Sequence, residues 1–206
     1  MSDSIPPYAP ELIEELEISI GVTKGFFSKI IHEDDWSFII KLHGMIDAGL
    51  TQIILEYFGD SRLDEPISRM NIQGGSGKLA FVRHLELLPK HNINFIQKLT
   101  EIRNVVVHRI ANTSFSIDAH IRSFSPQQMK DFVTACGDGI IPESLDFETP
   151  FEEQKIKVLL KDPRTSFWWS SVWVLGNLTK SKKFHQASRR IKEIESEIGR
   201  KIIDKK

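Results

Sequence analysis

Three neighbouring side chains of this 206-residue chain could act together on a phosphodiester: Arg103, Asn104 and His108. A histidine titrates near neutral pH, so it can take or give a proton during a reaction. The arginine fork matches phosphate oxygens and stays charged, and Asn104 could orient the imidazole ring. Cleavage of RNA by its own 2′-hydroxyl needs such a base, such a cation and an acid for the leaving oxygen. We take this as the candidate chemistry.

A helix is expected to carry this motif, because apolar residues recur around it at helical spacing. They form the stripe that should face the core: Phe95, Leu99, Ile102, Val106 and Ile110. Asn104 and His108 lie opposite that stripe, one turn apart. Arg103 and His108 point about 140° apart on such a helix, which is awkward for a single site. Two copies packed across a two-fold axis would bring these groups together, so the motif predicts a homodimer.

The segment 77–110 resembles the HEPN superfamily of all-helical domains. The signature of that superfamily is an arginine, commonly with a polar residue directly after it, then four to six intervening residues and a histidine. The nearest branch contains the mannitol operon repressor family. The shared features are an acidic start to a long helix, a Lys-Leu helix start, a short loop and the motif helix, here 34–36, Lys78-Leu79, the Pro89 loop and 102–108. The match covers about 33–111, and Val107 departs from the commoner residue before the histidine.

The resemblance implies an all-α protein, a HEPN-like up-and-down helical bundle with additional C-terminal helices, usually dimeric with the motif at the interface. Many HEPN proteins are metal-independent endoribonucleases that act as toxins or in defence against phage. Carried to this chain, Arg103 would bind or activate the phosphate, Asn104 would support the site and His108 would be the acid–base group. Other members lack catalysis and only bind RNA or a partner.

The alternative is therefore a non-catalytic regulatory or interaction module, and an antitoxin or another protein partner remains open. A DNA-binding repressor is a weaker third hypothesis, because no helix-turn-helix is apparent. No cofactor and no metal are expected, since the seven histidines are scattered with no pair at ligand spacing. The run GGSGK at 74–78 fails the phosphate-binding-loop pattern, because Ile72 and Leu79 occupy positions that need glycine and Ser or Thr.

Periodicity and capping signals predict helices along most of the chain. Asp34 or Asp35 should cap the helix predicted at 36–58, and Asn92 or Asn94 should cap the motif helix at 95–110. Ser125 should cap the helix at 126–136, which starts with a proline. An extended segment is expected at 114–124, and irregular chain at 59–77 and 142–150. The predicted helices are 11–31, weakened by Gly21 and Gly25, then 36–58, 78–88, 95–110, 126–136, 151–161, 167–178 and 181 onward.

Residues 1–113 are predicted to form the HEPN-like bundle core, and 114–206 a helical C-terminal extension packed on the same domain. From 180 to 206 the chain carries ten Lys or Arg against four Asp or Glu, although its overall net charge is −1. Arg189, Arg190 and Lys192 could therefore follow an RNA backbone. The same helix has apolar residues at spacings of three, four and seven, which instead favours a short coiled coil or docking face: Phe184, Ala187, Ile191, Ile194 and Ile198.

Two further groups have both a functional and a structural interpretation. His43 lies on the apolar stripe of 36–58, which favours a core or interface histidine, and Asp47 one turn on could pair with it or reach the motif helix. A tryptophan cluster could stack bases, although its helical spacing favours the core: Trp168, Trp169 and Trp173.

Composition predicts a cytoplasmic protein with no membrane partner. The single Cys136 excludes an intramolecular disulfide framework and fits a reducing compartment. The acidic N-terminus lacks the order of a signal peptide. The longest apolar run, 36–58, is interrupted by polar residues, which argues against a membrane span: Lys41, His43, Asp47 and Gln52.

Overall fold

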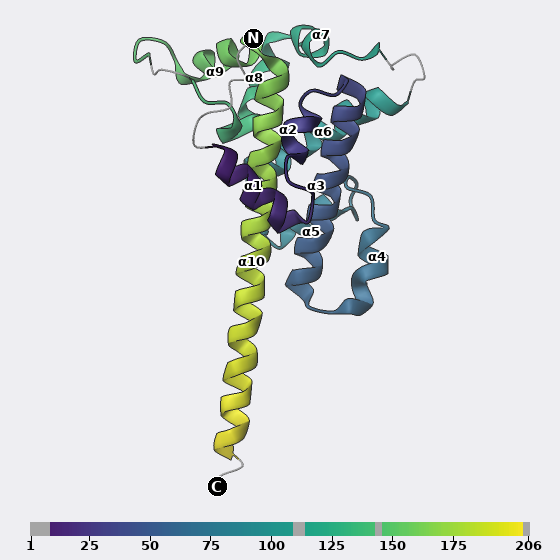
Figure 1. Cartoon of the computed structure of the whole chain (residues 1–206), viewed down its shortest axis with the longest axis vertical. Coiled ribbons are helices and arrows are strands. Elements are labelled where there is room, and N and C mark those ends of the chain that lie inside the picture. Colours follow the sequence, from purple (N-terminus) through teal and green to yellow (C-terminus); the bar gives the residue numbers. More distant parts are fainter. Residues whose placement is uncertain (1–8, 109–113, 143–145, 204–206) are drawn as a thin grey trace.

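The chain is all-α, as predicted. The structure, a computed structural model, describes residues 9–108, 114–142 and 146–203. Within these ranges it contains ten α-helices, short 3-10 turns and no strand. Most helices form a body from which the C-terminal half of the last helix projects (Figure 1).

Two long helices organise the body: α3 (Asp35–Phe58) and α10 (Pro163–Ile203), which lie side by side over the upper part of α10 (Figure 1). The predicted cap of α3 is confirmed, because Asp34 accepts a hydrogen bond from the Ser37 backbone N–H at 2.9 Å. In place of two predicted helices, 163–203 is one continuous helix of 41 residues. Neither glycine nor proline stands between 178 and 181, so nothing there interrupts the backbone hydrogen bonds.

The predicted helix 11–31 is in fact two helices, α1 (Ala9–Ile20) and α2 (Phe26–Ile30). Gly21 and Gly25 both adopt a φ of +78°, a left-handed conformation that ends one helix and precedes the next. Glu17 on α1 is buried, and its carboxylate accepts hydrogen bonds from two backbone N–H groups at the start of α2, those of Gly25 at 2.7 Å and Phe27 at 2.8 Å. The carboxylate thus fixes the angle between the helices.

Shorter helices lead into the motif helix. A 3-10 turn (Ser61–Leu63) and α4 (Asp64–Ser68) lie within the segment predicted as irregular, and α5 (Lys78–His84) is shorter than predicted. The motif helix α6 (Lys90–Val107) follows Pro89 directly, so the prediction of an asparagine cap was wrong. Asn92 is instead buried, and its Oδ1 accepts from Asn177 Nδ2 on α10 at 2.9 Å.

The segment 114–124 was predicted to be extended, and this was wrong. It contains α7 (Ile117–Arg122), whose N-terminus is capped by Ser116. The next helix, α8 (Pro126–Cys136), begins and ends as predicted, with a capping box between Ser125 and Gln128. α9 (Phe151–Lys161) also has its predicted bounds. Residues 146–150 are irregular, and 143–145 lie outside the described residues.

Phenylalanines from four helices meet at the centre of the core. The ring of Phe167 on α10 lies 5.2 Å from Phe95 on α6, 5.9 Å from Phe132 on α8 and 6.4 Å from Phe38 on α3, measured between centroids. All four side chains are buried. Helices on both sides of the predicted boundary at 113–114 therefore share one core, although 109–113 themselves lie outside the described residues.

Of the three tryptophans in the predicted 168–173 cluster, Trp168 is fully buried, and its indole N–H donates a hydrogen bond to the Phe27 carbonyl at 3.1 Å. Trp169 is half-buried and Trp173 is exposed. The core interpretation thus holds for Trp168 in particular.

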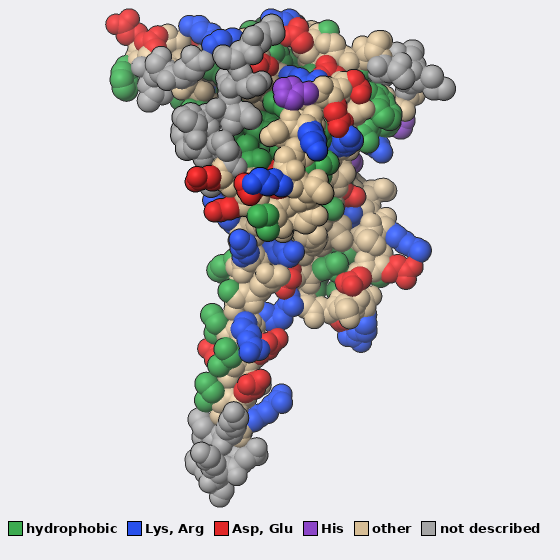
Figure 2. Space-filling view, viewed as in Figure 1, with side chains coloured by type: hydrophobic (Ala, Val, Ile, Leu, Met, Phe, Trp, Pro, Cys, Tyr) green, Lys and Arg blue, Asp and Glu red, His purple; other side chains and the backbone are tan. Residues whose placement is uncertain are grey.

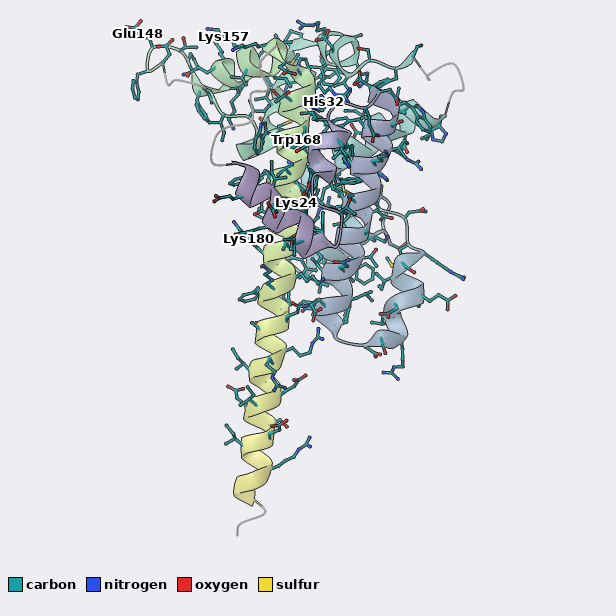
Figure 3. All side chains as sticks on the ribbon, viewed as in Figure 1. Lys24, His32, Glu148, Lys157, Trp168 and Lys180 are labelled. Carbon is teal, nitrogen blue, oxygen red and sulfur yellow. The ribbon has the colours of Figure 1, made fainter. Side chains whose placement is uncertain are left out.

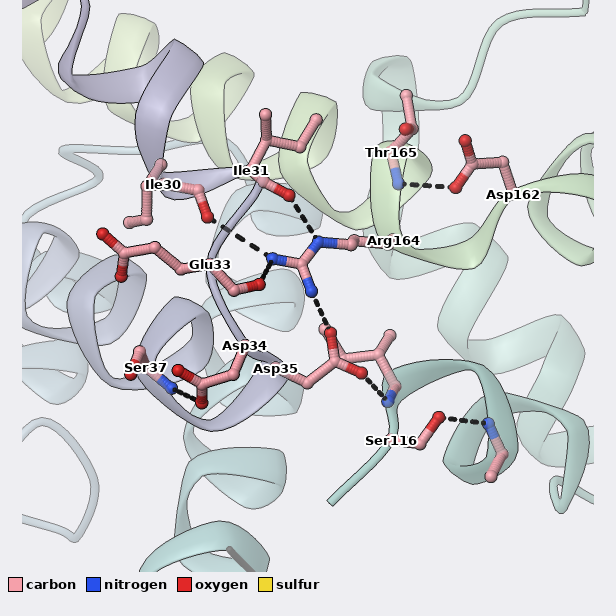
Figure 4. Close-up of polar contacts among 12 residues, drawn as sticks. Ile30, Ile31, Glu33, Asp34, Asp35, Ser37, Ser116, Asp162, Arg164 and Thr165 are labelled. Carbon is pink, nitrogen blue, oxygen red and sulfur yellow. Dashed lines mark hydrogen bonds and ion pairs between the residues drawn. The ribbon is translucent and has the colours of Figure 1, made fainter. Parts of the chain in front are cut away.

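Arg164, in the first turn of α10, ties this helix to the start of α3 (Figure 4). Its guanidinium donates to the backbone carbonyls of Ile31, at 2.7 Å, and Glu33, and it pairs with the Asp35 carboxylate. The other oxygen of Asp35 accepts from the Ile117 backbone N–H at 2.8 Å. One arginine–carboxylate pair thereby joins α10, α3 and α7.

α3 is long and apolar enough to cross a membrane, judged by length and composition alone. Core helices of other proteins pass the same test. Here its apolar side packs inside this chain, where seven of its residues are buried: Phe38, Ile39, Leu42, Ile46, Leu50, Ile53 and Ile54.

Candidate functional site

Helix α6 holds the motif in place by burying one side. The predicted core stripe is confirmed for the residues that the structure describes, each at most 4% exposed: Phe95, Leu99, Ile102 and Val106. Ile110 lies outside the described residues. The position of the motif side chains is therefore set by the packing of the opposite side of their own helix.

Arg103 and Asn104 form one unit on this helix. Both are half-buried, and Arg103 Nη1 donates to Asn104 Oδ1 at 3.2 Å. The amide oxygen thus faces the guanidinium, whereas the sequence suggested that Asn104 would orient the imidazole. An arginine held by a neighbouring amide has less freedom to reorient, which suits a group that binds an anion.

His108 lies at the end of the motif helix. α6 ends at Val107, and the His108 backbone N–H donates to the Asn104 carbonyl at 3.2 Å, which completes the last turn. The prediction that the helix continues to Ile110 is therefore wrong for His108, and 109–113 lie outside the described residues. The side chain of His108 is exposed, as predicted from its place opposite the core stripe, so a substrate in solution can reach it.

Helix α3 brings a second histidine close to Arg103. Burial lowers the pKa of His43, and the positive charges of Arg103 and, more weakly, Lys78 lower it further, against an opposing effect of Asp47. The His43 Nε2 atom is buried and has no hydrogen-bond partner among the described residues. His43 therefore favours the neutral form beside the motif arginine.

Lys78 is the residue of this region that the sequence did not single out as a site residue. Only 1% of its side chain is exposed, yet its Nζ lies 2.6 Å from Asp47 Oδ1 on α3 and 3.4 Å from the Ser68 carbonyl. A lysine directly after a glycine-rich loop, at the first position of a helix, was its only signal in the sequence. Asp47 was predicted to pair with His43 or to reach α6, whereas in the structure its carboxylate forms an ion pair with Lys78 of α5.

The motif face also carries an exposed apolar side chain. Val105 is 46% exposed and lies between Asn104 and the buried Val106. At 100° per residue Val105 lies roughly 60° from His108 and 100° from Asn104, but about 160° from Arg103, so it shares a side of the helix only with the first two. Exposed apolar side chains among polar ones are typical of protein interfaces.

The basic residues of the C-terminal helix lie apart from the motif, because α10 projects from the body that contains α6 (Figure 1). Arg189 pairs with Glu56 of α3, with its Nη2 2.5 Å from Oε1, and also donates to the Glu56 carbonyl. Arg190 forms an exposed pair with Glu193 at 3.2 Å, and Lys192 is exposed. Of the three predicted RNA contacts, Arg189 is thus already held by the body.

Among the described residues, no group of three or more His, Cys, Asp or Glu side chains could hold a metal ion. Comparison of the chain with family models, curated proteins and solved structures gave no match.

Proposed function

We propose that the chain is a HEPN-like endoribonuclease of the toxin or phage-defence type that needs no metal ion. The observation that carries the proposal is the arrangement on α6, where Arg103 is hydrogen-bonded to Asn104 and an exposed His108 follows at the helix end. A fixed cation for a phosphate and an accessible acid–base group are two of the elements that RNA transesterification requires, and a second acid–base group is the third.

In the proposed reaction, a histidine takes the proton of a ribose 2′-hydroxyl, and the resulting oxygen attacks the adjacent phosphorus. The bond from phosphorus to the 5′-oxygen of the next nucleotide breaks, and that oxygen receives a proton from an acid. The products are a 2′,3′-cyclic phosphate and a 5′-hydroxyl. Arg103 binds the phosphate oxygens, where it stabilises the charge that grows in the transition state.

Two copies of α6 supply the base and the acid. Each chain contributes one His108, and the exposed Val105 on the same face supports a contact between copies that excludes water. In this homodimer the two Arg103 and two His108 side chains line one cleft. His43 and Lys78 do not contact RNA in this scheme, because the Nε2 atom of His43 and the side chain of Lys78 are both buried.

The projecting helix provides a secondary RNA contact through Arg190 and Lys192, both exposed. Arg189 contributes less, because its guanidinium is held by Glu56. The protein acts in the cytoplasm, without cofactor or membrane, and an antitoxin or another protein partner restrains it.

The second candidate is a non-catalytic regulatory or interaction module. The exposure of Val105, on the same side of α6 as His108, favours it, because an exposed apolar side chain also suits a protein contact. The two candidates differ in chemistry. Incubation of the protein with a tRNA pool in EDTA, followed by end-group analysis, yields 2′,3′-cyclic phosphates if the first is right and intact RNA if the second is.

A further inference from the structure

One side of the projecting part of α10 is apolar and uncovered. Hydrophobic side chains run along it below the body (Figure 2). The helix contacts α3 as far as Arg189. Beyond the body its side chains extend into solvent (Figure 3). The large apolar side chains there are between 42% and 66% exposed: Phe184, Ile191, Ile194 and Ile198. We call these four residues, with Ala187, the α10 seam.

The opposite side of the same helix is already used within the chain. Lys182 donates to Gln52 at 3.1 Å, Gln186 donates to Glu56 at 3.1 Å, and Arg189 pairs with Glu56. At 100° per residue these three positions lie roughly 160° from the seam. These contacts with α3 hold the side of α10 opposite the seam, so the seam faces solvent.

The seam has the spacing of a coiled coil. Phe184, Ile191 and Ile198 are seven residues apart, and Ala187 and Ile194 follow the first two by three. These are the a and d positions of a heptad repeat. From Phe184 to Ile198 the seam extends over roughly 21 Å of helix. On a single helix the apolar side chains of the seam stay in contact with water. A second helix with the same repeat would cover them.

Charges beside the seam suit a second copy of this chain. The flanking g positions hold Lys183, Arg190 and Glu197, and the e positions include Glu195. In a parallel pair, Arg190 faces Glu195 of the other copy, and in an antiparallel pair it faces Glu197. The helix thus presents opposite charges to itself in either direction. The present partner of Arg190 is Glu193 on the same exposed helix, a contact that is easily exchanged.

We infer that the α10 seam is a self-association surface, on which a second copy of this chain packs as a two-helix coiled coil. The inference does not depend on the proposed nuclease activity, because the seam and the motif lie on different helices. The body contacts α10 as far as Arg189, and the helix continues to Ile203, so the seam is already helical before a second copy binds.

Sedimentation equilibrium of the full chain tests this, over about a hundredfold range of protein concentration. Ile194→Glu places a charge in the seam, and Ser196→Glu adds the same charge to an exposed position on the other side of the helix. We expect Ile194→Glu to weaken association at least about tenfold, because an isoleucine that should be buried becomes charged. Ser196→Glu should associate as the wild type does.

Two results would overturn the inference: a wild-type chain that stays monomeric over the whole range, or an Ile194→Glu variant that associates as tightly as the wild type. In the first case the seam accommodates a different partner or none. In the second, association uses another surface, such as the motif face of α6. A strictly monomeric wild type would also count against the α6 homodimer of the proposed nuclease, whereas the second result would not; RNA cleavage itself is measured separately.

Discussion

Lys78 Nζ lies 2.6 Å from Asp47 Oδ1, although only 1% of the lysine side chain is exposed. The pair joins the first residue of α5 to the middle of α3, directly beside the motif helix. A buried ammonium is tolerated because the carboxylate and the Ser68 carbonyl both accept from it. The contact thus holds α5 against α3, the helix that also carries His43 close to Arg103.

Removal of the carboxylate should destabilise the protein strongly. Asp47→Asn leaves the buried charge of Lys78 without its counter-ion, which we expect to lower the free energy of unfolding by on the order of 3 kcal/mol. Denaturant unfolding measures this. Lys41→Gln is the control, because Lys41 and Glu33 form a pair at 2.6 Å whose side chains are 44% and 31% exposed. That substitution should cost less than about 1 kcal/mol. Equal losses would mean that the Lys78 pair adds nothing beyond a surface contact.

Acid should destabilise the fold through two histidines. Burial lowers the pKa of His43, with help from Arg103, and burial also lowers the pKa of His120. Below the ordinary histidine value of 6.5 the unfolded chain therefore binds more protons than the folded chain does. The free energy of unfolding should fall as the pH is lowered from about 7 towards 5, and it should level off below the folded pKa values.

His43→Gln removes one of these two groups, so its stability should change less over the same pH range. The exposed His32 provides the control, as His32→Gln should keep the wild-type slope. Urea unfolding at a series of pH values checks both variants. A wild-type slope in His43→Gln would contradict the placement of His43.

The lone cysteine should be inert in the native protein. Burial raises the pKa of Cys136 to about 12, against a smaller lowering effect of a hydrogen bond to Ser170 and of the Lys155 charge. Since the thiolate is the reactive form, a thiol reagent at neutral pH should label the folded chain only as fast as it unfolds. Labelling in denaturant should be immediate. Rapid labelling of the folded chain would contradict the burial of this residue.

Arg164 should be sensitive even to a conservative change. Arg164→Lys keeps the charge but loses the planar guanidinium, whose several N–H groups reach the Ile31 and Glu33 carbonyls and the Asp35 carboxylate at once. A compact ammonium group cannot reach all three acceptors. We expect a loss on the order of 2 kcal/mol in thermal or urea unfolding. Arg83→Lys, at an exposed position of α5, is the matched control and should be neutral. A neutral Arg164→Lys would mean that the arginine contacts do not stabilise the start of α10.

The sequence predicted the parts of the fold that local chemistry decides. Asp34 and Ser125 mark helix starts whose capping depends only on neighbouring residues. The core side of α6 also followed from spacing alone. The extended segment at 114–124 was wrong because alternating residues suggested a strand, whereas the Ser116 cap and packing on the body favour α7.

Long-range contacts of the site could not be predicted in this way. The sequence gives no sign that Lys78 reaches Asp47, since 31 residues separate them. It also gives no sign that Arg103 lies close enough to His43 to affect its pKa. Both relations depend on how α3, α5 and α6 cross. The motif itself was evident because its residues lie within six consecutive positions at the end of one helix.

In the proposed function, Arg103 and His108 cleave RNA. The most direct measurement is cleavage of a tRNA pool in EDTA by the wild type, Arg103→Ala and His108→Ala, beside the exposed control variants Arg83→Ala and His32→Ala. Circular dichroism verifies the fold of each variant. We predict cleavage by the wild type and both controls, and a loss of at least about a hundredfold in each motif variant. Intact RNA with folded wild-type protein, or full activity in folded His108→Ala, would contradict the account.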